Sequence, residues 1–180
     1  FRALVRSVIY QQLNGKAAAT ILARFVALFF PVPEGEEDLK SERFPTPQQV
    51  RNMDLAVLKS AGLSGRKAEY LHSLADRFLD GAITNEKLLT LSDAEISALL
   101  TSVKGIGQWT VDMFLIFTLR RPNVLPTGDL GVRRGMASHF GMTGAAKGKK
   151  GYLPSAAEME AAAVLWEPYR TIGSFYMWRI

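Results

Sequence analysis

The sequence contains no cysteine and only two histidines in 180 residues. Without thiols the chain cannot form disulfides, use a thiolate nucleophile or hold a cysteine-ligated zinc or iron–sulfur site. The two isolated histidines, His72 and His139, also argue against a histidine metal site. No apolar run approaches the roughly 20 residues that a membrane-spanning helix requires.

β-Strand patterns are missing as well. We find no convincing run of alternating apolar and polar residues between turns, whereas apolar residues recur at helical spacing along the chain. The first such series runs from Leu4 to Leu13. A hydrophobic content of 48% is typical of a packed globular protein. The sequence predicts an all-α fold with short connections.

Helix starts are marked by residue types that cap free backbone amides. Capping-box sequences begin at Thr46, Ser92 and Ser155, and Asn14 favours the N-cap of a second helix. The helix that starts at Ser155 is expected to run through Trp166. These signals predict helices in every part of the chain.

The net charge of +5 is unevenly distributed. Residues 1–103 contain 12 basic and 12 acidic residues, whereas residues 104–180 contain 10 and 5. A local basic excess suits a polyanion such as nucleic acid, but charge alone favours the alternative of a solvated basic surface. The acidic segment 31–46 is predicted to be a solvated connection facing away from DNA, and 144–151 a flexible basic loop. Because the chain begins at Phe1 rather than Met, we expect a fragment truncated at both ends.

A glycine-rich turn, Lys104–Gly107, separates two predicted helices, the second of which is expected to end at Arg120–Arg121. The first amides of a helix lack intrahelical partners and carry the positive end of the helix dipole, so an anion can bind there. Gly105 and Gly107 remove side chains that would keep a phosphate away, and Lys104 adds a cation. These residues predict a binding site for the phosphates of a nucleic-acid backbone. The alternative is an ordinary interhelical turn.

A single carboxylate, Asp129, follows about twenty residues after the turn in the segment 125–131, which is rich in glycine and proline. An isolated acid in such a loop is a candidate for chemistry on a bound substrate. The alternative is a helix N-cap before Leu130, and the two roles conflict little.

At these residues the chain resembles a known family. Residues 103–111 are similar to the helix-hairpin-helix of the DNA glycosylases of that superfamily, and residues 125–131 to its Gly/Pro-rich loop with an essential aspartate. The closest resemblance is to the 3-methyladenine (alkylpurine) branch, which residues 7–13, 61–68 and 166–170 also match in order.

The resemblance implies a helix-hairpin-helix glycosylase fold with two helical subdomains flanking a catalytic cleft. One subdomain is expected at about 25–125, including the hairpin at 101–121, and the other from about 1–24 and 126–180. Two departures stand out. Lys104 replaces a proline of many relatives, and Gly128 replaces a second acidic residue that relatives often carry.

The resemblance also implies roles for particular residues. Asp129, kept ionised by nearby amides or cations, stabilises an oxocarbenium-like sugar and orients or deprotonates water. Aromatic faces attract a cationic base, although core packing is the alternative for each pocket residue. The implied base pocket is Trp109, Trp178, Met113 and Tyr176, and the implied backbone contacts are Lys104, Gly105, Gly107 and Thr110. The wedge candidates are Gln12, Leu13, Asn14 and Ser64, and the carbonyls of Thr101, Val103 and Ile106 are implied to hold a sodium or potassium ion when DNA is bound.

Together these features predict a monofunctional DNA glycosylase of base excision repair, because Trp109 stands where bifunctional relatives carry a lysine nucleophile. It would release alkylated purines, of the 3-methyladenine and 7-methylguanine type, from duplex DNA and leave an abasic site. We expect a monomer with no other cofactor and no membrane partner, in the nucleus of a eukaryote or otherwise in the cytoplasm or nucleoid. The alternatives are a non-catalytic helix-hairpin-helix DNA-binding module and a glycosylase for another lesion, such as uracil.

Overall fold

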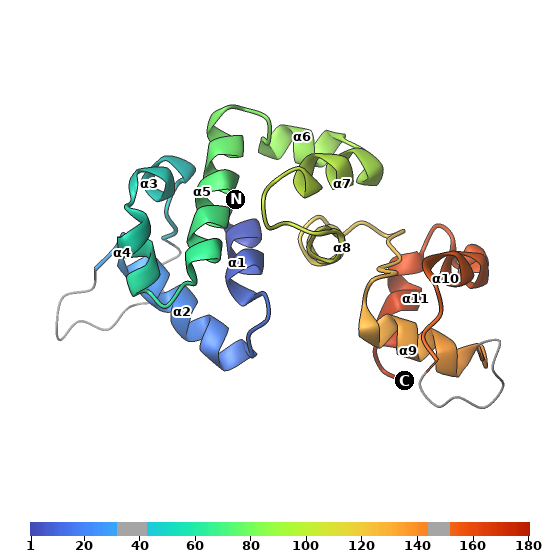
Figure 1. Ribbon diagram of the computed structural model, residues 1–180. Coiled ribbons are helices and arrows are strands. Elements are labelled where there is room, and N and C mark those ends of the chain that lie inside the picture. The colour runs from blue at the N-terminus through green and yellow to red at the C-terminus, as the bar shows by residue number, and fades with distance from the viewer. Residues whose placement is uncertain (32–42, 144–151) are drawn as a thin grey trace. The chain divides into compact units, whose positions relative to one another are not determined.

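The computed structural model describes residues 1–31, 43–143 and 152–180, and in these residues it is entirely helical (Figure 1). The all-α prediction is therefore confirmed. Most of the predicted acidic connection, residues 32–42, and the predicted basic loop 144–151 lie outside the described residues. No described helix is long and apolar enough to cross a membrane.

The chain divides into two compact units, Phe1–Gly107 and Gln108–Ile180, so the boundary falls inside the predicted hairpin. The expected grouping of residues 1–24 with 126–180 into one subdomain remains a prediction.

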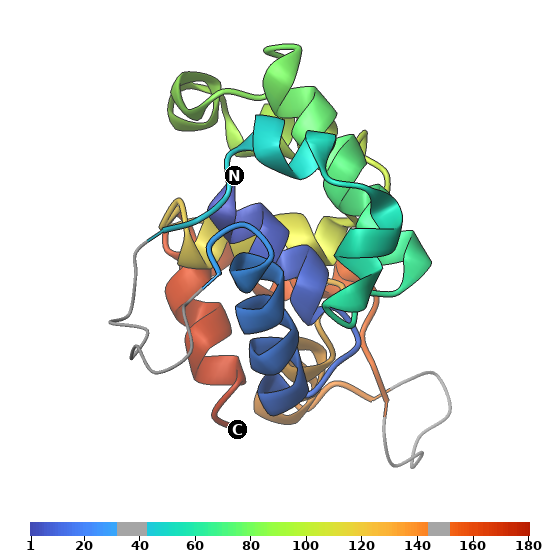
Figure 2. The same ribbon diagram turned by 90° about the vertical axis from the view of Figure 1, so that its left-hand side faces the viewer.

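The first unit is built around its longest helix, α5. Helix α5 packs against α1, α3 and α4, and α1 packs in turn against α2 (Figures 1 and 2). The helices in the described residues of this unit are α1 (Arg2–Tyr10), α2 (Gly15–Ala27), α3 (Pro47–Asn52), α4 (Leu55–Ser60), α5 (Gly65–Leu79), α6 (Asn85–Thr90) and α7 (Asp93–Thr101).

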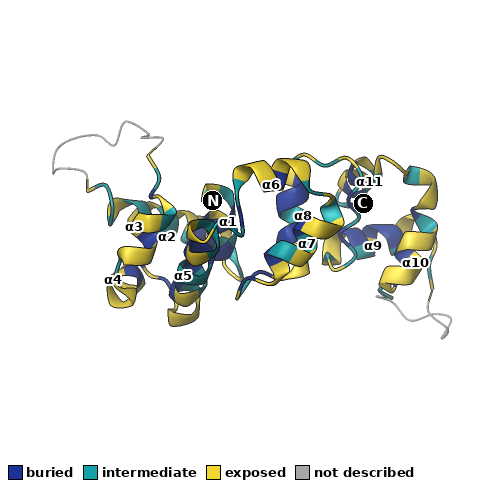
Figure 3. Ribbon diagram, turned by 90° about the horizontal axis from the view of Figure 1, so that it is seen from above, coloured by how far each residue is buried: buried dark blue, intermediate teal, exposed yellow. Residues whose placement is uncertain are grey.

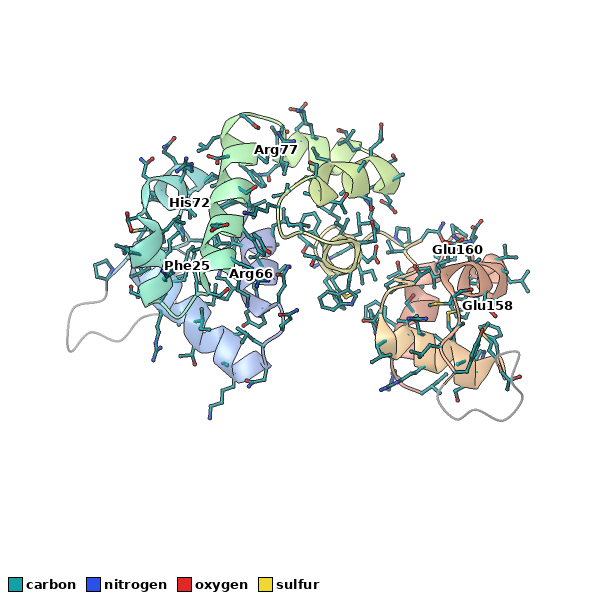
Figure 4. The ribbon with its side chains drawn as sticks, in the orientation of Figure 1. Phe25, Arg66, His72, Arg77, Glu158 and Glu160 are labelled. Atoms are coloured by element: carbon teal, nitrogen blue, oxygen red, sulfur yellow. The ribbon has the colours of Figure 1, made fainter. Side chains whose placement is uncertain are left out.

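The core of the first unit comes from the apolar faces that the sequence pattern predicts. On α1 the buried residues are Leu4, Val5, Val8 and Ile9, and Phe25 of α2 is also fully buried (Figure 4). Burying one such side chain contributes about 2 kcal/mol before the entropy of ordering it is counted. Leu13, the last member of the predicted series, is different: α1 ends at Tyr10, and Leu13 is 39% exposed.

All three predicted capping boxes are present. The backbone N–H groups of Thr46, Ser92 and Ser155 donate to the Gln49, Glu95 and Glu158 side chains at 2.9, 2.8 and 2.8 Å. The hydroxyl of Tyr152 and then the groups of Ser155 lower the pKa of Glu158 to about 2. Local sequence therefore sets where these helices begin.

The second unit contains α8 (Gln108–Phe117), α9 (Leu130–His139), α10 (Ala156–Ala162), the 3₁₀ turn η1 (Val164–Trp166) and α11 (Arg170–Met177). Helix α9 packs against α11, and a Cβ on Gly135 would collide with the Met177 backbone. Buried residues are concentrated where these helices meet (Figure 3), and the core consists of Val132, Met136, Met159, Ala163 and Met177.

Two helix ends differ from the sequence predictions. The helix after the hairpin ends at Phe117 rather than Arg121, because Arg120 adopts a left-handed backbone conformation with φ of 54°. The amides of Leu119 and Arg121 then donate back to the Phe114 and Leu115 carbonyls. The helix that starts after Ser155 ends at Ala162 and continues as the separate 3₁₀ turn η1.

Candidate active site

Asp129 is the N-cap of α9. Its backbone is extended, and its Oδ1 accepts a hydrogen bond of 2.9 Å from the Val132 N–H. The N-cap prediction is therefore confirmed. The position also places the carboxylate at the positive end of the α9 dipole, where a negative charge is stabilised.

Two indole groups donate hydrogen bonds to the same carboxylate. The Nε1 of Trp109, at the start of α8, lies 2.8 Å from Oδ2, and the Nε1 of Trp178, at the end of α11, lies 2.8 Å from Oδ1. Three segments of the second unit therefore meet at Asp129. The sequence suggested both tryptophans as aromatic walls, but it did not indicate that their N–H groups hold the aspartate.

These donors control the ionisation of Asp129. Burial raises the pKa of its carboxyl group, but the hydrogen bonds from Trp109, Val132, Trp178 and Gly131 outweigh burial and lower the pKa below its usual value. Amide donors were expected, whereas the two indoles take the place of the cations that were also considered. Asp129 is consequently an anion at neutral pH.

Gly131 allows Trp178 to approach Asp129. A Cβ on Gly131 would lie 2.8 Å from the Trp178 Cδ1 atom and 3.2 Å from the Asp129 Oδ1 atom, which is closer than side chains normally pack. A Cβ on Gly128 would meet nothing within 4 Å. The two glycines that flank the aspartate therefore differ, because only Gly131 is required by packing.

An aromatic cluster lies next to the carboxylate. The rings of Phe117 and Trp178 are stacked with centroids 5.9 Å apart, and Phe175 meets both rings edge-on at 5.7 and 5.4 Å. Phe117 and Phe175 are 57% and 43% exposed. Sequence reasoning missed both, because a phenylalanine in an apolar helix is indistinguishable from a core residue until the fold exposes it. The i, i+3 spacing of Phe175 and Trp178 was the available signal.

The other two expected pocket residues are less informative. Met113 is half-buried one turn after Trp109, and Tyr176 is 62% exposed on α11. Their place in a base pocket remains a prediction.

A second carboxylate, Asp112, is buried in α8 with only 6% of its surface exposed. Its Oδ1 accepts a 2.8 Å hydrogen bond from the Gln108 Nε2 group. Burial raises the pKa of Asp112, the Gln108 bond opposes this rise, and the negative charge of Asp129 adds to it. Sequence reasoning assigned Asp112 no role.

In the first unit, position 105 of the turn requires glycine. Gly105 has φ of 86°, and a Cβ there would collide with the ring of Tyr70. Gly107 has open space around its missing Cβ, so its backbone remains accessible to a ligand. Lys104 is exposed and forms an ion pair of 2.7 Å with Glu69, and this contact raises the pKa of Lys104.

The remaining hairpin predictions concern backbone groups. Thr110 is buried, with 4% of its surface exposed, and its contact with the DNA backbone remains a prediction. The Val103 carbonyl accepts a 3.1 Å hydrogen bond from the Ile106 amide and keeps a second lone pair. A monovalent cation on the carbonyls of Thr101, Val103 and Ile106 remains a prediction. No group of three or more potential metal-binding side chains is present among residues 1–31, 43–143 and 152–180.

The four wedge candidates fall into two kinds. Asn14 and Ser64 are helix caps, since their side chains accept from the amides of Ala17 and Lys67. Gln12 and Leu13 are exposed, and Gln12 has a left-handed backbone with φ of 56°. The structure therefore presents Gln12 and Leu13 outward at the α1–α2 corner.

Two residues, Gln11 and Lys67, connect this corner to the turn through contacts that sequence reasoning did not predict. The Nε2 of Gln11 donates to the Gly105 carbonyl at 2.9 Å, and the Nζ of Lys67 donates to the Ile9 and Gln11 carbonyls, both at 2.7 Å. Burial lowers the pKa of Lys67. Gln11, Gln12, Lys67 and Tyr70 line one pocket of about 490 Å³ together with Ser64, Gly65 and Arg66.

Comparisons with known proteins show to which family the chain belongs. Residues 5–167 match the model of the HhH-GPD superfamily of base excision DNA repair proteins. The chain is 33% identical to DNA-3-methyladenine glycosylase 1 of Schizosaccharomyces pombe over 99% of its own length and 71% of that protein. The chain therefore belongs to the HhH-GPD superfamily.

Two solved structures are similar over almost the whole chain. A Schizosaccharomyces pombe 3-methyladenine DNA glycosylase in complex with abasic DNA is 33% identical with a TM-score of 0.75, and the match covers 98% of this chain and 78% of that one. A DNA-3-methyladenine glycosidase from Bacillus halodurans is 30% identical with a TM-score of 0.81, and the match covers 99% and 74% of the two chains.

Proposed function

We propose that the protein is a monofunctional DNA-3-methyladenine glycosylase of base excision repair. It binds duplex DNA as a monomer, in the nucleus of a eukaryote or otherwise in the cytoplasm or nucleoid. It hydrolyses the bond between an alkylated purine and its sugar and leaves an abasic site. The observation that carries this proposal is the Asp129 carboxylate, held ionised by the N–H groups of Trp109 and Trp178.

The charge of Asp129 suits this reaction. A purine methylated at N3 or N7 is already a cation and leaves readily, so the protein has little need of a strong acid. Its departure leaves positive charge on the sugar, as in glycoside hydrolysis. An anionic carboxylate stabilises this charge and orients or deprotonates the attacking water.

Aromatic rings beside Asp129 suit the leaving base. Phe117, Phe175 and Trp178 form a cluster in which Trp178 touches both the other rings and the carboxylate. The faces of such rings attract a cation and stack on a flat base. This cluster supports electron-poor, alkylated purines as substrates, and 3-methyladenine and 7-methylguanine are examples of this class.

The absence of strand cutting follows from residue 109. A bifunctional enzyme needs an amine that attacks the sugar and forms a Schiff base. Trp109 occupies the corresponding position, and Lys104, in the turn, is paired with Glu69. The DNA strand is therefore expected to remain intact after the base has been released.

Binding would begin at the phosphate backbone and continue at the base stack. The accessible Gly107 and the cation Lys104 suit a phosphate contact. The damaged base must leave the stack to be hydrolysed, and a side chain must fill the space it vacates. The exposed Gln12 and Leu13 are the better suited wedge candidates, because the side chains of Asn14 and Ser64 already cap helices.

A base-release assay tests the proposed function. Duplexes carrying 3-methyladenine, 7-methylguanine, ethenoadenine or uracil are incubated with the protein, and free base and strand scission are measured separately. We expect release of methylated purines and strand breaks only after alkaline treatment. Preferential release of uracil would support the alternative lesion class, and salt-dependent DNA binding without any base release would support a non-catalytic module.

A further inference from the structure

We infer that Lys67 and Gln11 are positioning residues that join the wedge corner to the backbone-gripping turn, so that holding the phosphate and opening the base stack occur in one fixed geometry. The wedge corner is residues 11–14, and the turn is residues 104–107. This inference rests on the proposed function, because it assigns these residues to base extrusion. Neither side chain is proposed to contact the damaged base or its sugar.

The connection consists of three hydrogen bonds, two donated by Lys67 and one by Gln11. The Lys67 ammonium group donates to the Ile9 and Gln11 carbonyls, both at 2.7 Å, where α1 ends. The side chain of Gln11 then donates to the Gly105 carbonyl at 2.9 Å, across 94 positions of the sequence. Charged donors make the stronger hydrogen bonds, so the Lys67 contacts hold the corner firmly.

The corner needs such support because its backbone is unusual. Gln12 has φ of 56°, a conformation that is unfavourable for a residue with a side chain. Surrounding contacts must stabilise it. Lys67 binds the carbonyl immediately before Gln12, and Leu13 follows immediately after it. The same contacts therefore set the direction in which the exposed Gln12 and Leu13 side chains point.

The turn is held against the same helix. A Cβ on Gly105 would collide with the Tyr70 ring, and Tyr70 lies on α5 one turn after Lys67. Arg66 occupies the first turn of α5 beside Lys67 (Figure 4). Helix α5 thus supports the corner through Lys67 and the turn through Tyr70, while Gln11 links the two directly.

The chain contains a matched control. Lys87 donates to the Gly81 and Ala82 carbonyls, at 2.6 and 3.3 Å, shortly after the other end of α5. Its chemistry is the same as that of Lys67, but its partners belong neither to the wedge corner nor to the turn. Lys67→Met and Lys87→Met each keep an apolar stem and remove the ammonium group.

The experiment compares two duplexes that differ only in the cost of extruding the base. One carries 7-methylguanine in a normal pair, and the other carries it opposite an abasic-site analogue, where extrusion costs less. Single-turnover release rates are measured for the wild type and both variants. We expect Lys67→Met to reduce the rate on the paired lesion by about tenfold more than the rate on the unpaired lesion. Lys87→Met should leave this ratio unchanged.

Two further variants complete the test. Lys67→Arg retains charged donors and should restore the ratio at least in part. Gln11→Leu removes only the link to Gly105, so it should reproduce the defect of Lys67→Met, and it carries the test if Lys67→Met does not fold. The double variant should be no worse than the more impaired single variant, because the two side chains act in series. Equal loss on both duplexes in Lys67→Met and Gln11→Leu, or no loss at all, overturns the inference.

A second measurement separates this inference from the proposed function. 2-Aminopurine placed beside an abasic-site analogue becomes more fluorescent when its stack is opened, and this signal requires no hydrolysis. We expect a smaller increase for Lys67→Met than for the wild type and Lys87→Met at saturating protein. If the wild type opens the stack but releases no methylated purine, the proposed function has failed while the positioning role remains. Equal fluorescence for all three proteins overturns the positioning role.

Discussion

The surroundings of Asp129 and Asp112 show how differently one protein treats two carboxylates. Asp129, at the start of α9, accepts hydrogen bonds from two indoles and from backbone amides, and its pKa is lowered although burial alone would raise it. Asp112, inside α8, is almost completely buried and accepts a hydrogen bond from Gln108, and burial raises its pKa. The balance between burial and hydrogen-bond donors, rather than the residue type, decides which carboxylate has the lower pKa.

The substitution with the largest expected effect is Asp129→Asn. Asparagine caps a helix as well as aspartate does, so α9 and the fold should be retained. The negative charge is lost, and the single-turnover rate of base release should fall by at least about 100-fold. Binding to abasic-site DNA should persist, as measured by fluorescence anisotropy. If the variant releases base at the wild-type rate, Asp129 is not the catalytic carboxylate.

Trp178→Phe should come next in size. The ring remains beside Phe117 and Phe175, but the N–H donor to Oδ1 is lost. Since this donor lowers the pKa of Asp129, its removal raises that pKa, and activity should be lost at a higher pH as the solution is acidified. We expect about a tenfold lower rate at neutral pH, the scale of one charge-assisted hydrogen bond.

The control for this prediction is Trp166→Phe. Trp166 packs against the core of the second unit and has no bond to Asp129 among the described contacts. Its replacement should leave the acid limb of the pH–rate profile in place. An identical shift in both variants would mean that the second unit is loosened in general.

Gly131→Ala tests whether packing or loop flexibility matters beside the carboxylate. The added methyl group would lie 2.8 Å from the Trp178 Cδ1 atom, so the indole must move away from Asp129. We expect a several-fold loss of activity and a loss of about 1–3 kcal/mol in the free energy of unfolding. Gly128→Ala, with open space at the same atom, should change neither quantity appreciably, and comparable losses in the two variants would exclude a specific clash.

Asp112→Asn should have the smallest effect on activity. Unlike Gly131→Ala, it should increase the free energy of unfolding. The pKa of Asp112 is raised in the folded protein, so ionising this group opposes folding, and its cost grows as the pH rises from the unfolded-state pKa to the folded-state pKa. The neutral variant should therefore be more stable than the wild type at neutral pH, by about 1 kcal/mol. The difference should vanish at low pH, where both side chains are neutral.

Denaturant unfolding at several pH values measures this difference. Base release should change by less than about threefold, because Asp129 is the proposed catalytic carboxylate and Asp112 is almost completely buried. A large loss of activity in Asp112→Asn with retained stability would show that both carboxylates take part.

Some features of the fold and the site could be predicted from the sequence because they depend only on residues close together in the chain. The capping boxes, the N-cap at Asp129 and the glycine turn at 105–107 each act over three or four positions of the chain. The ends of α8 at Phe117 and of α10 at Ala162 could not be predicted in this way. Arg120, shortly after the end of α8, has a left-handed backbone conformation that is not typical of arginine, so the residue type did not predict it.

The sequence by itself determined the all-α class, the helix starts, the family and the position of a lone carboxylate after a glycine turn, because these follow from local patterns and matching motifs. Only the tertiary structure decided what surrounds that carboxylate. It brought Trp178 to Asp129 across 49 positions and Gln11 to Gly105 across 94, and it exposed Phe117 beside Trp178. Such contacts depend on how helices pack, and no local periodicity encodes which N–H group will face which oxygen.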